Sequence, residues 1–191
     1  MNEPNNKTDQ ELVADAKKDK DAFIEIIRRY EMPIRRYIRR LGCRDHHDVE
    51  DLFQDIFIKV YKNINEYDSD LKFSSWLYRI AHNETISFYR KKSIRPTAVI
   101  TEEETYLFEN IADETDFTEF IDAKINADIL RVALGELEEQ YRDVLVLRFF
   151  EEKSYAEISD ILKIPEGTVA TLLNRGKKRM NEILTAKKIK L

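Results

Sequence analysis

Apolar residues recur every three or four positions along most of this chain, a spacing that places them on one face of an α-helix. The pattern is clearest over Asp48–Lys62, where the apolar face consists of Val49, Leu52, Phe53, Ile56, Phe57 and Val60. A similar stripe over Ala22–Leu41 predicts a helix that Pro33 kinks or splits. After a short polar loop, a third stripe contains Trp76, Leu77, Ile80, Ala81 and Phe88. We therefore predict one compact helical domain over residues 20–93, preceded by an N-terminal extension over residues 1–19.

The last third of the chain returns to helical spacing after an acidic stretch that has no clear period. We predict a linker over residues 94–122 and a second helical domain over residues 123–191. Ser154–Glu157 matches a capping box that starts a helix, and Ile164–Val169 is a tight turn into a final helix. Two helices joined by such a turn indicate a helix-turn-helix, although a plain helical hairpin would share the pattern.

Composition narrows the class of protein. The 191 residues include only four glycines and four prolines, too few for the turns of a β-sandwich or the glycine loops of a P-loop or Rossmann enzyme. The longest apolar run is Val144–Leu147, so neither a transmembrane helix nor a signal peptide is expected. The single cysteine, Cys43, suits a reducing cytosol. We expect a soluble, cytoplasmic, all-α protein.

The net charge of −5 hides three basic clusters on an acidic chain. Two of them lie over Lys72–Arg95 and Arg175–Lys190. The third consists of Arg28, Arg29, Arg35, Arg36, Arg39 and Arg40. Local basic patches allow an acidic protein to hold a polyanion such as DNA and keep other faces for a different partner. Charge runs are often only solvated helix faces, but basic clusters in both halves favour DNA binding.

A helix-turn-helix gives the second domain a specific role. Its second helix fits the major groove of DNA, which is ~12 Å wide, and offers polar side chains to base edges. The helix N-terminus offers free N–H groups to a phosphate. Lys177, Lys178 and Arg179 would add phosphate contacts that give affinity without sequence choice. The motif therefore predicts that the second domain binds duplex DNA.

Three segments carry a family resemblance: Asp48–Phe57, Phe73–Asn83 and Ser154–Val169. In this order they resemble the core-binding helix, the promoter-melting helix and the last domain (σ4) of the extracytoplasmic-function (ECF) sigma factors, of the sigma-70 family. The resemblance extends over nearly the whole chain. It implies an all-α fold of two small helical domains, a σ2 bundle and a σ4 helix-turn-helix, joined by the acidic linker.

The resemblance implies a bacterial alternative sigma factor that binds core RNA polymerase, directs it to specific promoters and helps to melt their −10 region. The residues that would bind core polymerase are Asp48, Asp51, Gln54 and Asp55. The residues that would bind −10 DNA are Asn63, Asn65, Tyr67, Ser69, Lys72, Arg79, His82, Asn83, Ser87, Arg90 and Lys91. In relatives the loop in this set captures a base flipped out of the stack, which requires compensating hydrogen bonds and stacking.

The final helix would bind the −35 element through Glu166, Thr168, Thr171, Asn174, Arg175, Lys178 and Arg179. Relatives usually carry Lys-Ser-Arg after Gly-Thr-Val, where this chain has Ala170–Leu172. An arginine that can bind guanine bidentately, a contact worth ~1–3 kcal/mol of discrimination, is absent there. Three explanations stay open: a different −35 sequence, readout of the DNA backbone and shape, or weaker dependence on this element.

The partners implied are core RNA polymerase, promoter DNA and an anti-sigma factor that holds the protein inactive until a signal releases it. The chain would be a monomer when free or 1:1 with the anti-sigma factor, which could hold it at the inner membrane face. The alternative is a DNA-binding regulator whose first domain senses a ligand or dimerises, and which binds duplex DNA without polymerase.

Enzymatic activity is not expected. Cys43, His46 and His47 invite a metal site, but adjacent histidines on a helix cannot easily face one ion and a closed zinc site needs four ligands. No nucleophile–base pair or phosphate-binding glycine loop is recognisable. We therefore expect no catalytic residue, metal, cofactor or small-molecule substrate.

Overall fold

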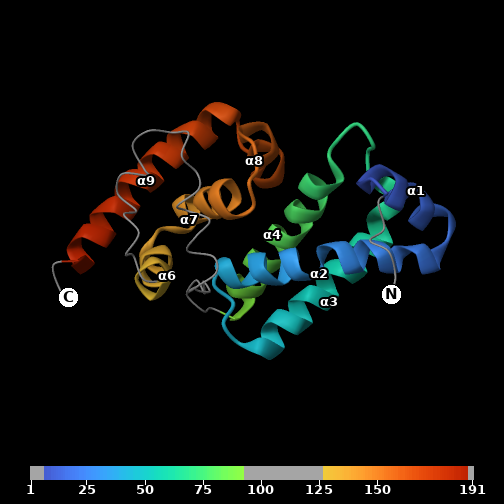
Figure 1. Ribbon diagram of the computed structural model, residues 1–191, viewed down its shortest axis with the longest axis horizontal. Coiled ribbons are helices and arrows are strands. Elements are labelled where there is room, and N and C mark those ends of the chain that lie inside the picture. The colour runs from blue at the N-terminus through green and yellow to red at the C-terminus, as the bar shows by residue number, and fades with distance from the viewer. Residues whose placement is uncertain (1–6, 93–126, 189–191) are drawn as a thin grey trace.

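The computed structural model describes residues 7–92 and 127–188, and every regular element within these ranges is helical (Figure 1). The prediction of an all-α fold is thus confirmed for the described part of the chain. The linker predicted over residues 94–122 lies outside the described residues. The helices form two groups, one on each side of that gap in the sequence.

The first domain contains the helices that the apolar stripes predict. Its elements are α1 (Asp9–Lys18), η1 (Lys20–Ala22), α2 (Phe23–Arg40), α3 (His46–Asn63), η2 (Ile64–Glu66) and α4 (Phe73–Lys92). The stripes of α2, α3 and α4 meet in one core, in which Ile34, Ile56 and Leu77 are completely buried. Burying such side chains contributes about 1.5–3 kcal/mol each relative to exposure.

Pro33 does not split α2, which continues as one helix from Phe23 to Arg40. Proline lacks an N–H group, so the carbonyl one turn earlier has no helical hydrogen bond from it. The apolar stripe continues on both sides of Pro33, with Ile26 and Ile34 both fully buried. We infer that packing of this stripe keeps the helix continuous despite the missing bond.

Helix α1 is part of the first domain. Thr8 and Glu11 form a capping box at its start, and Leu12, Val13 and Ala16 are buried in the same core as α2 and α4. From Lys7 onward, the N-terminal extension predicted over residues 1–19 is therefore packed structure.

The second domain consists of α6 (Ala127–Glu136), α7 (Glu139–Leu145), the π-helical segment η3 (Val146–Phe150), α8 (Tyr155–Leu162) and α9 (Glu166–Lys188). Helix α8 begins at the predicted capping box, in which Ser154 and Glu157 satisfy each other's backbone N–H groups. It ends at Lys163, whose φ of 57° is left-handed, and Pro165 leads into α9. The predicted helix-turn-helix is confirmed.

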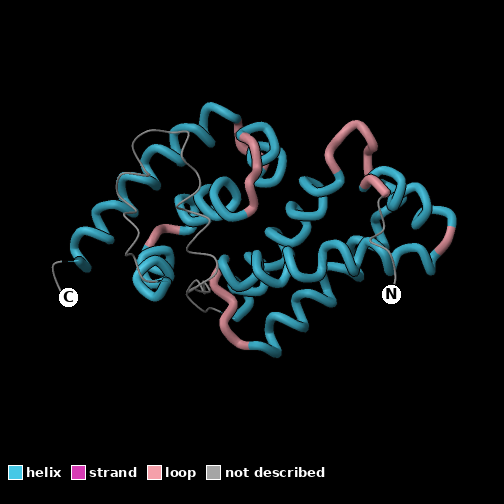
Figure 2. Tube along the Cα trace, viewed as in Figure 1, coloured by secondary structure: helices cyan, strands magenta, loops and turns pink. Residues whose placement is uncertain are grey.

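The two domains are in contact along α4. Helix α8 lies beside α4 near the top of Figure 2, and α7 lies between α9 and the first domain (Figure 1). Helix α9 approaches α7 closely at Gly176, where a Cβ atom would lie 3.3 Å from Leu145 Cδ1. The helix-turn-helix is thereby held against the helix predicted to melt promoters.

Candidate functional site

The polar face of α3 carries the residues predicted to bind polymerase. Asp51, Gln54 and Asp55 are exposed, because the apolar face of the same helix is in the core. Asp48 lies in the first turn and is partly buried, and its carboxylate accepts a 2.5 Å hydrogen bond from Lys92 Nζ of α4. Three of the four predicted residues are thus free to meet a partner, while Asp48 is tied to its own domain.

An apolar groove of about 350 Å³ adjoins this polar face. Gln54 is its polar lining residue, and the other lining residues are Phe23, Ile27, Phe53, Phe57, Ile58 and Tyr61. Ile58 is 51% exposed and Tyr61 38%. A contiguous exposed apolar surface bordered by polar side chains is typical of a site that another protein covers.

The predicted base-capture segment extends over residues 63–73, and residues 63–72, which precede α4, form the base-capture loop. Three of its predicted contacts are exposed: Asn65, Ser69 and Lys72. Asn63 donates its side-chain amide to a carbonyl in the last turn of α3 at 2.9 Å. Tyr67 is only 4% exposed, so its ring lies in the core and does not face solvent. The accessible base-contacting chemistry of this loop therefore lies with the three exposed side chains.

Helix α4 presents most of its predicted DNA contacts to solvent. The exposed ones are Asn83, Ser87, Arg90 and Lys91. Arg79 is partly buried, and the His82 side chain is 12% exposed. The exposed members extend over the C-terminal half of the helix, where two adjacent cations can contact phosphates.

His82 lies between the two domains. Its Nδ1 is 3.2 Å from the hydroxyl of Tyr37, and its Nε2 is 3.7 Å from Oδ2 of Asp143 on α7. Burial lowers the pKa of His82 to about 4, and the charges of Arg142 and Arg90 act in the same direction. Burial also raises the pKa of Asp143 to about 7, against the opposing effect of Arg142. At neutral pH the imidazole is therefore uncharged, and the contact with Asp143 is not a full ion pair.

A second contact buries a charge pair between the domains. Arg40, at the end of α2, pairs with Glu151, which directly follows η3, and the two side chains are 3% and 5% exposed. The hydroxyl of Tyr78 on α4 donates a 2.5 Å hydrogen bond to the same carboxylate. Burial raises the pKa of Glu151, while Arg40 and the Tyr78 hydrogen bond oppose the rise. Removing either partner would deprive the other of a buried counter-charge.

A third contact joins the base-capture loop to the helix-turn-helix. Lys72 Nζ lies 3.3 Å from Oε1 of Glu157 on α8. Together with the contact between His82 and Asp143, it places acids of the second domain against groups predicted to meet promoter DNA. In this arrangement the second domain covers part of the proposed −10 surface.

Six of the predicted −35 contacts, from Thr168 to Arg179, share one face of α9, and Glu166 lies in its first turn. All seven are exposed: Glu166, Thr168, Thr171, Asn174, Arg175, Lys178 and Arg179. The opposite face packs into the second domain through Val169, Leu173, Met180 and Leu184. Arg179 pairs with Glu182 at 2.9 Å. The helix can therefore enter a major groove with its polar face while its apolar face stays packed.

The sequence did not predict the contacts between the two domains. Arg40 belongs to a basic cluster predicted to hold a polyanion, but the structure buries it against Glu151. The two residues are 111 positions apart, and no local pattern connects them. The only hint in the sequence is that Arg40 and Glu151 each lie beside strongly apolar segments.

The polar loop before α3 is the place where a metal site was considered. Cys43 is buried, and burial raises the pKa of its thiol to about 11. Asp45 caps α3, where its carboxylate accepts a 3.1 Å hydrogen bond from the Asp48 N–H. In the described parts of the chain, no group of three or more His, Cys, Asp or Glu side chains could hold a metal ion. None of the described helices is long and apolar enough to cross a membrane.

Comparison with known proteins identifies relatives for both domains. The sigma-70 region 2 family matches residues 26–94, and the sigma-70 region 4 family matches residues 127–180. The ECF RNA polymerase sigma factor SigW of Bacillus subtilis (strain 168) is 35% identical over 172 residues, which cover 88% of this chain and 91% of SigW. RNA polymerase sigma factor YlaC of the same strain is 30% identical over 170 residues, 88% of this chain and 95% of YlaC.

Solved structures show the same fold. CnrH, in complex with the cytosolic domain of CnrY, has a TM-score of 0.67 at 22% identity, covering 93% of this chain and 97% of CnrH. The sigma factor RpoE of Bartonella quintana, in complex with the anti-sigma factor NepR, has a TM-score of 0.63 at 22% identity, covering 87% and 98%. The fold and the sequence similarity to SigW agree, and the chain therefore belongs to the ECF RNA polymerase sigma factors of the sigma-70 family.

Proposed function

We propose that this chain binds core RNA polymerase through α3, directs it to specific promoters and helps to melt their −10 region. The observation that carries the polymerase step is the surface of α3, where Asp51, Gln54 and Asp55 are exposed and Gln54 also lines an apolar groove. The acids supply charge for orientation and the groove supplies area that a partner can bury. Family membership supports core RNA polymerase as the partner of this surface.

The promoter contacts are divided between the domains in this proposal. The σ2-like domain, residues 20–93, binds the −10 region through the base-capture loop and the exposed face of α4. The σ4-like domain, residues 123–191, binds the −35 element through the polar face of α9. This division is supported by the exposure of all seven predicted side chains on α9 and of four on α4.

Regulation by an anti-sigma factor is part of the proposal. Two structural neighbours were solved in complex with a regulatory partner: CnrH with the cytosolic domain of CnrY, and RpoE with the anti-sigma factor NepR. A similar partner would hold this chain inactive in the cytoplasm, at the inner membrane face if that partner spans the membrane. The same apolar groove would be lost to polymerase if the partner covered it.

The decisive experiment is co-elution of the purified chain with bacterial core RNA polymerase. Asp51→Arg combined with Gln54→Arg is expected to abolish co-elution, because both changes reverse or add charge on an exposed face. The control is Gln10→Arg with Glu66→Arg, which makes the same change in charge at exposed positions of the same domain. Circular dichroism verifies that both variants fold.

The outcomes separate the two candidate functions. Loss of binding in the α3 variant alone supports docking at this surface. Equal binding by all three proteins would discard the assignment of α3. Failure of the unaltered chain to bind polymerase, together with binding to duplex DNA as a dimer, would favour the alternative DNA-binding regulator.

A further inference from the structure

We infer that α1 holds the base-capture loop, residues 63–72, in position for binding. Lys17 contacts the loop directly, and the hydrogen bond between Asp9 and Tyr30 fixes α1 next to the aromatic residues that pack on the loop. The inference rests on the proposed function, which assigns −10 base capture to this loop. It gives a role in promoter recognition to a helix that lies before both matched family regions. The contacts below connect α1 to the loop in two ways.

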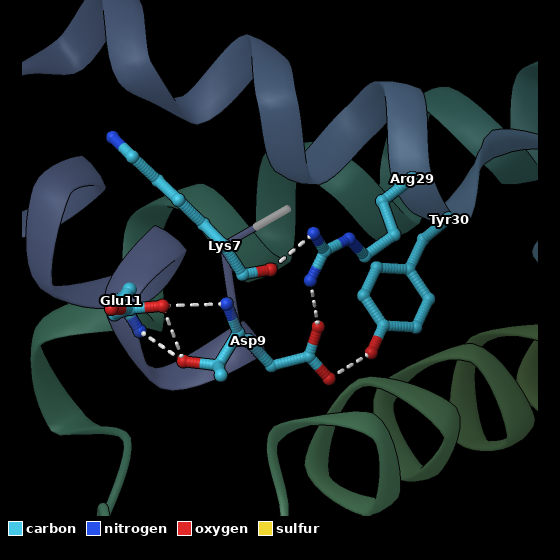
Figure 3. A network of polar contacts seen from close by, with 6 residues as sticks. Lys7, Asp9, Glu11, Arg29 and Tyr30 are labelled. Atoms are coloured by element: carbon cyan, nitrogen blue, oxygen red, sulfur yellow. Dashed lines mark hydrogen bonds and ion pairs between the residues drawn. The ribbon is translucent and has the colours of Figure 1, made fainter. Parts of the chain in front are cut away.

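The first connection fixes α1 on α2 (Figure 3). One oxygen of the Asp9 carboxylate accepts a 2.8 Å bond from Arg29, and the other accepts a 2.5 Å bond from the Tyr30 hydroxyl. Arg29 also donates a 2.5 Å hydrogen bond to the backbone carbonyl of Lys7. These bonds are accepted by Lys7 and by Asp9 in the first turn of α1, whose start the capping box already defines. The helix is therefore held at a defined position relative to Tyr30.

An aromatic layer continues from Tyr30 to the loop. The Tyr30 ring packs edge-on against Phe73, with ring centres 5.8 Å apart. Tyr67, in the middle of the loop, packs on Phe73 and Trp76 with centres 5.4 Å apart in each case. Aromatic pairs at these separations contribute beyond their buried area. The first turn of α4 thus fixes the position of the Tyr67 ring.

The second connection is direct. Lys17, in the last turn of α1, donates its Nζ to the backbone carbonyl of Tyr67 at 3.3 Å, and the same ammonium lies 5.7 Å from the centre of that ring. The Tyr67 hydroxyl in turn donates to the carbonyl of Leu71, which closes the loop on itself. Asp68 stabilises the intervening turn by accepting a 3.0 Å hydrogen bond from the Asp70 N–H. The backbone of Tyr67 is therefore fixed by α1, and its hydroxyl is fixed by the loop.

This arrangement prepares the loop for a ligand. The backbone of Tyr67 is anchored, while Asn65 and Ser69, two residues away on either side, are exposed. A loop already held in its binding conformation avoids the ordering cost that a mobile loop pays when it binds. Loosening the anchor should therefore weaken base capture without removing any group that touches the base.

Lys17 could instead contact a DNA phosphate directly, since it is exposed. The two roles differ in their salt dependence. Loss of one phosphate contact lowers the slope of log affinity against log salt by about one. Loss of a positioning contact lowers the affinity and leaves the slope unchanged.

Trp76 fluorescence can report on how firmly Lys17 holds Tyr67, because Trp76 is the only tryptophan in the chain and its ring contacts that of Tyr67. The test compares Lys17→Ala with Lys17→Arg, which keeps a cationic donor, and with Lys18→Ala, which removes the adjacent exposed charge. Acrylamide quenching of Trp76 fluorescence in the full chain reports on the loop. We expect increased quenching in Lys17→Ala, and unchanged quenching in the other two variants.

Binding is then measured with holoenzyme. The probe is the single-stranded −10 oligonucleotide that the unaltered holoenzyme selects from a pool with a randomised −10 strand. Lys17→Ala is expected to weaken binding of this strand about threefold to tenfold, the range for loss of one such hydrogen bond. The salt slope and the affinity for core polymerase should not change, and Lys17→Arg should restore binding.

Each of three other results would overturn either the inference or the proposed function. Unchanged strand affinity in Lys17→Ala overturns the inference even if Trp76 quenching changes, because α1 would then be only a structural brace. A lower salt slope with unchanged quenching also overturns it, because Lys17 would be a phosphate contact. If the unaltered holoenzyme selects no strand, the proposed function fails at the promoter step and the inference falls with it.

Discussion

The buried pair between Arg40 and Glu151 gives a quantitative prediction about how the two domains associate. Glu151→Gln keeps the shape of the side chain but removes its charge, so the guanidinium of Arg40, whose side chain is 3% exposed, loses the counter-charge that Glu151 supplies. Breaking a buried pair by removing one partner typically costs about 3–5 kcal/mol. Arg40 also lies 4.8 Å from the ring centre of Phe150, which retains part of its stabilisation, so we expect about 3 kcal/mol.

The cost should appear as separation of the domains, because Arg40 belongs to the first domain and Glu151 to the second. A loss of about 3 kcal/mol reduces the ratio of closed to open molecules about 100-fold. Small-angle X-ray scattering of the full chain should then show a larger radius of gyration for Glu151→Gln. The control is Glu152→Gln, which makes the same substitution at the adjacent exposed position.

A double variant tests the cause. Arg40→Met with Glu151→Leu replaces the charge pair by apolar side chains of similar size, a change that is often neutral or stabilising in buried pairs. We expect it to restore the compact form. A radius of gyration that is the same in Glu151→Gln and the unaltered chain would refute the argument that this pair holds the domains together.

Two further predictions concern pH and DNA. Between about pH 8 and 6.5 the closed form should gain stability as the pH falls, by at most about 1.4 kcal/mol per pH unit, because Asp143 holds a proton at a pKa of about 7 when buried and near 3.8 when exposed. Below about pH 6.5 the gain should level off, because burial lowers the pKa of His82 from 6.5 to about 4, so that between these values His82 binds a proton only in the open form. Small-angle scattering across this pH range, on the unaltered chain and on Asp143→Asn, checks the gain and its levelling off. Arg175→Ala should weaken promoter binding by the holoenzyme and lower the salt slope by about one, as measured by filter binding at several salt concentrations, whereas Lys20→Ala should not.

Two results would contradict these expectations. If Asp143→Asn still gains stability as the pH falls from 8 to 6.5, a group other than Asp143 binds the proton. If Arg175→Ala leaves both the affinity and the salt slope unchanged, that side chain faces away from the DNA backbone.

The helices could be predicted from the sequence because the information for them is local. The apolar stripe of α3 and the capping box at Ser154 depend on residues three or four positions apart. Surface exposure follows from the same periodicity, so the accessible polar faces of α3 and α9 could also be predicted. The continuity of α2 at Pro33 could not, because it depends on packing against α3 and α4.

Contacts between distant segments could not be predicted. Tyr67 has the chemistry of a base contact, but tertiary packing buries its ring between Phe73 and Trp76. The role of α1 depends on the bond from Lys17 to the Tyr67 carbonyl, across 50 positions. These are properties of the folded arrangement, and neither residue type nor spacing specifies them.

The pair between Arg40 and Glu151 also constrains how this chain can diverge and be engineered. Each residue is stabilised in its buried position by the charge of the other, so a change at one position favours a compensating change at the other. We expect the two positions to covary between the first and second domains of related chains that share this contact. A chimera that joins the first domain of this chain to the second domain of a relative lacking an acid at position 151 would inherit a buried arginine without the counter-charge that Glu151 supplies. Exchange of promoter specificity by swapping domains therefore depends on matching this contact as well as the DNA-binding face.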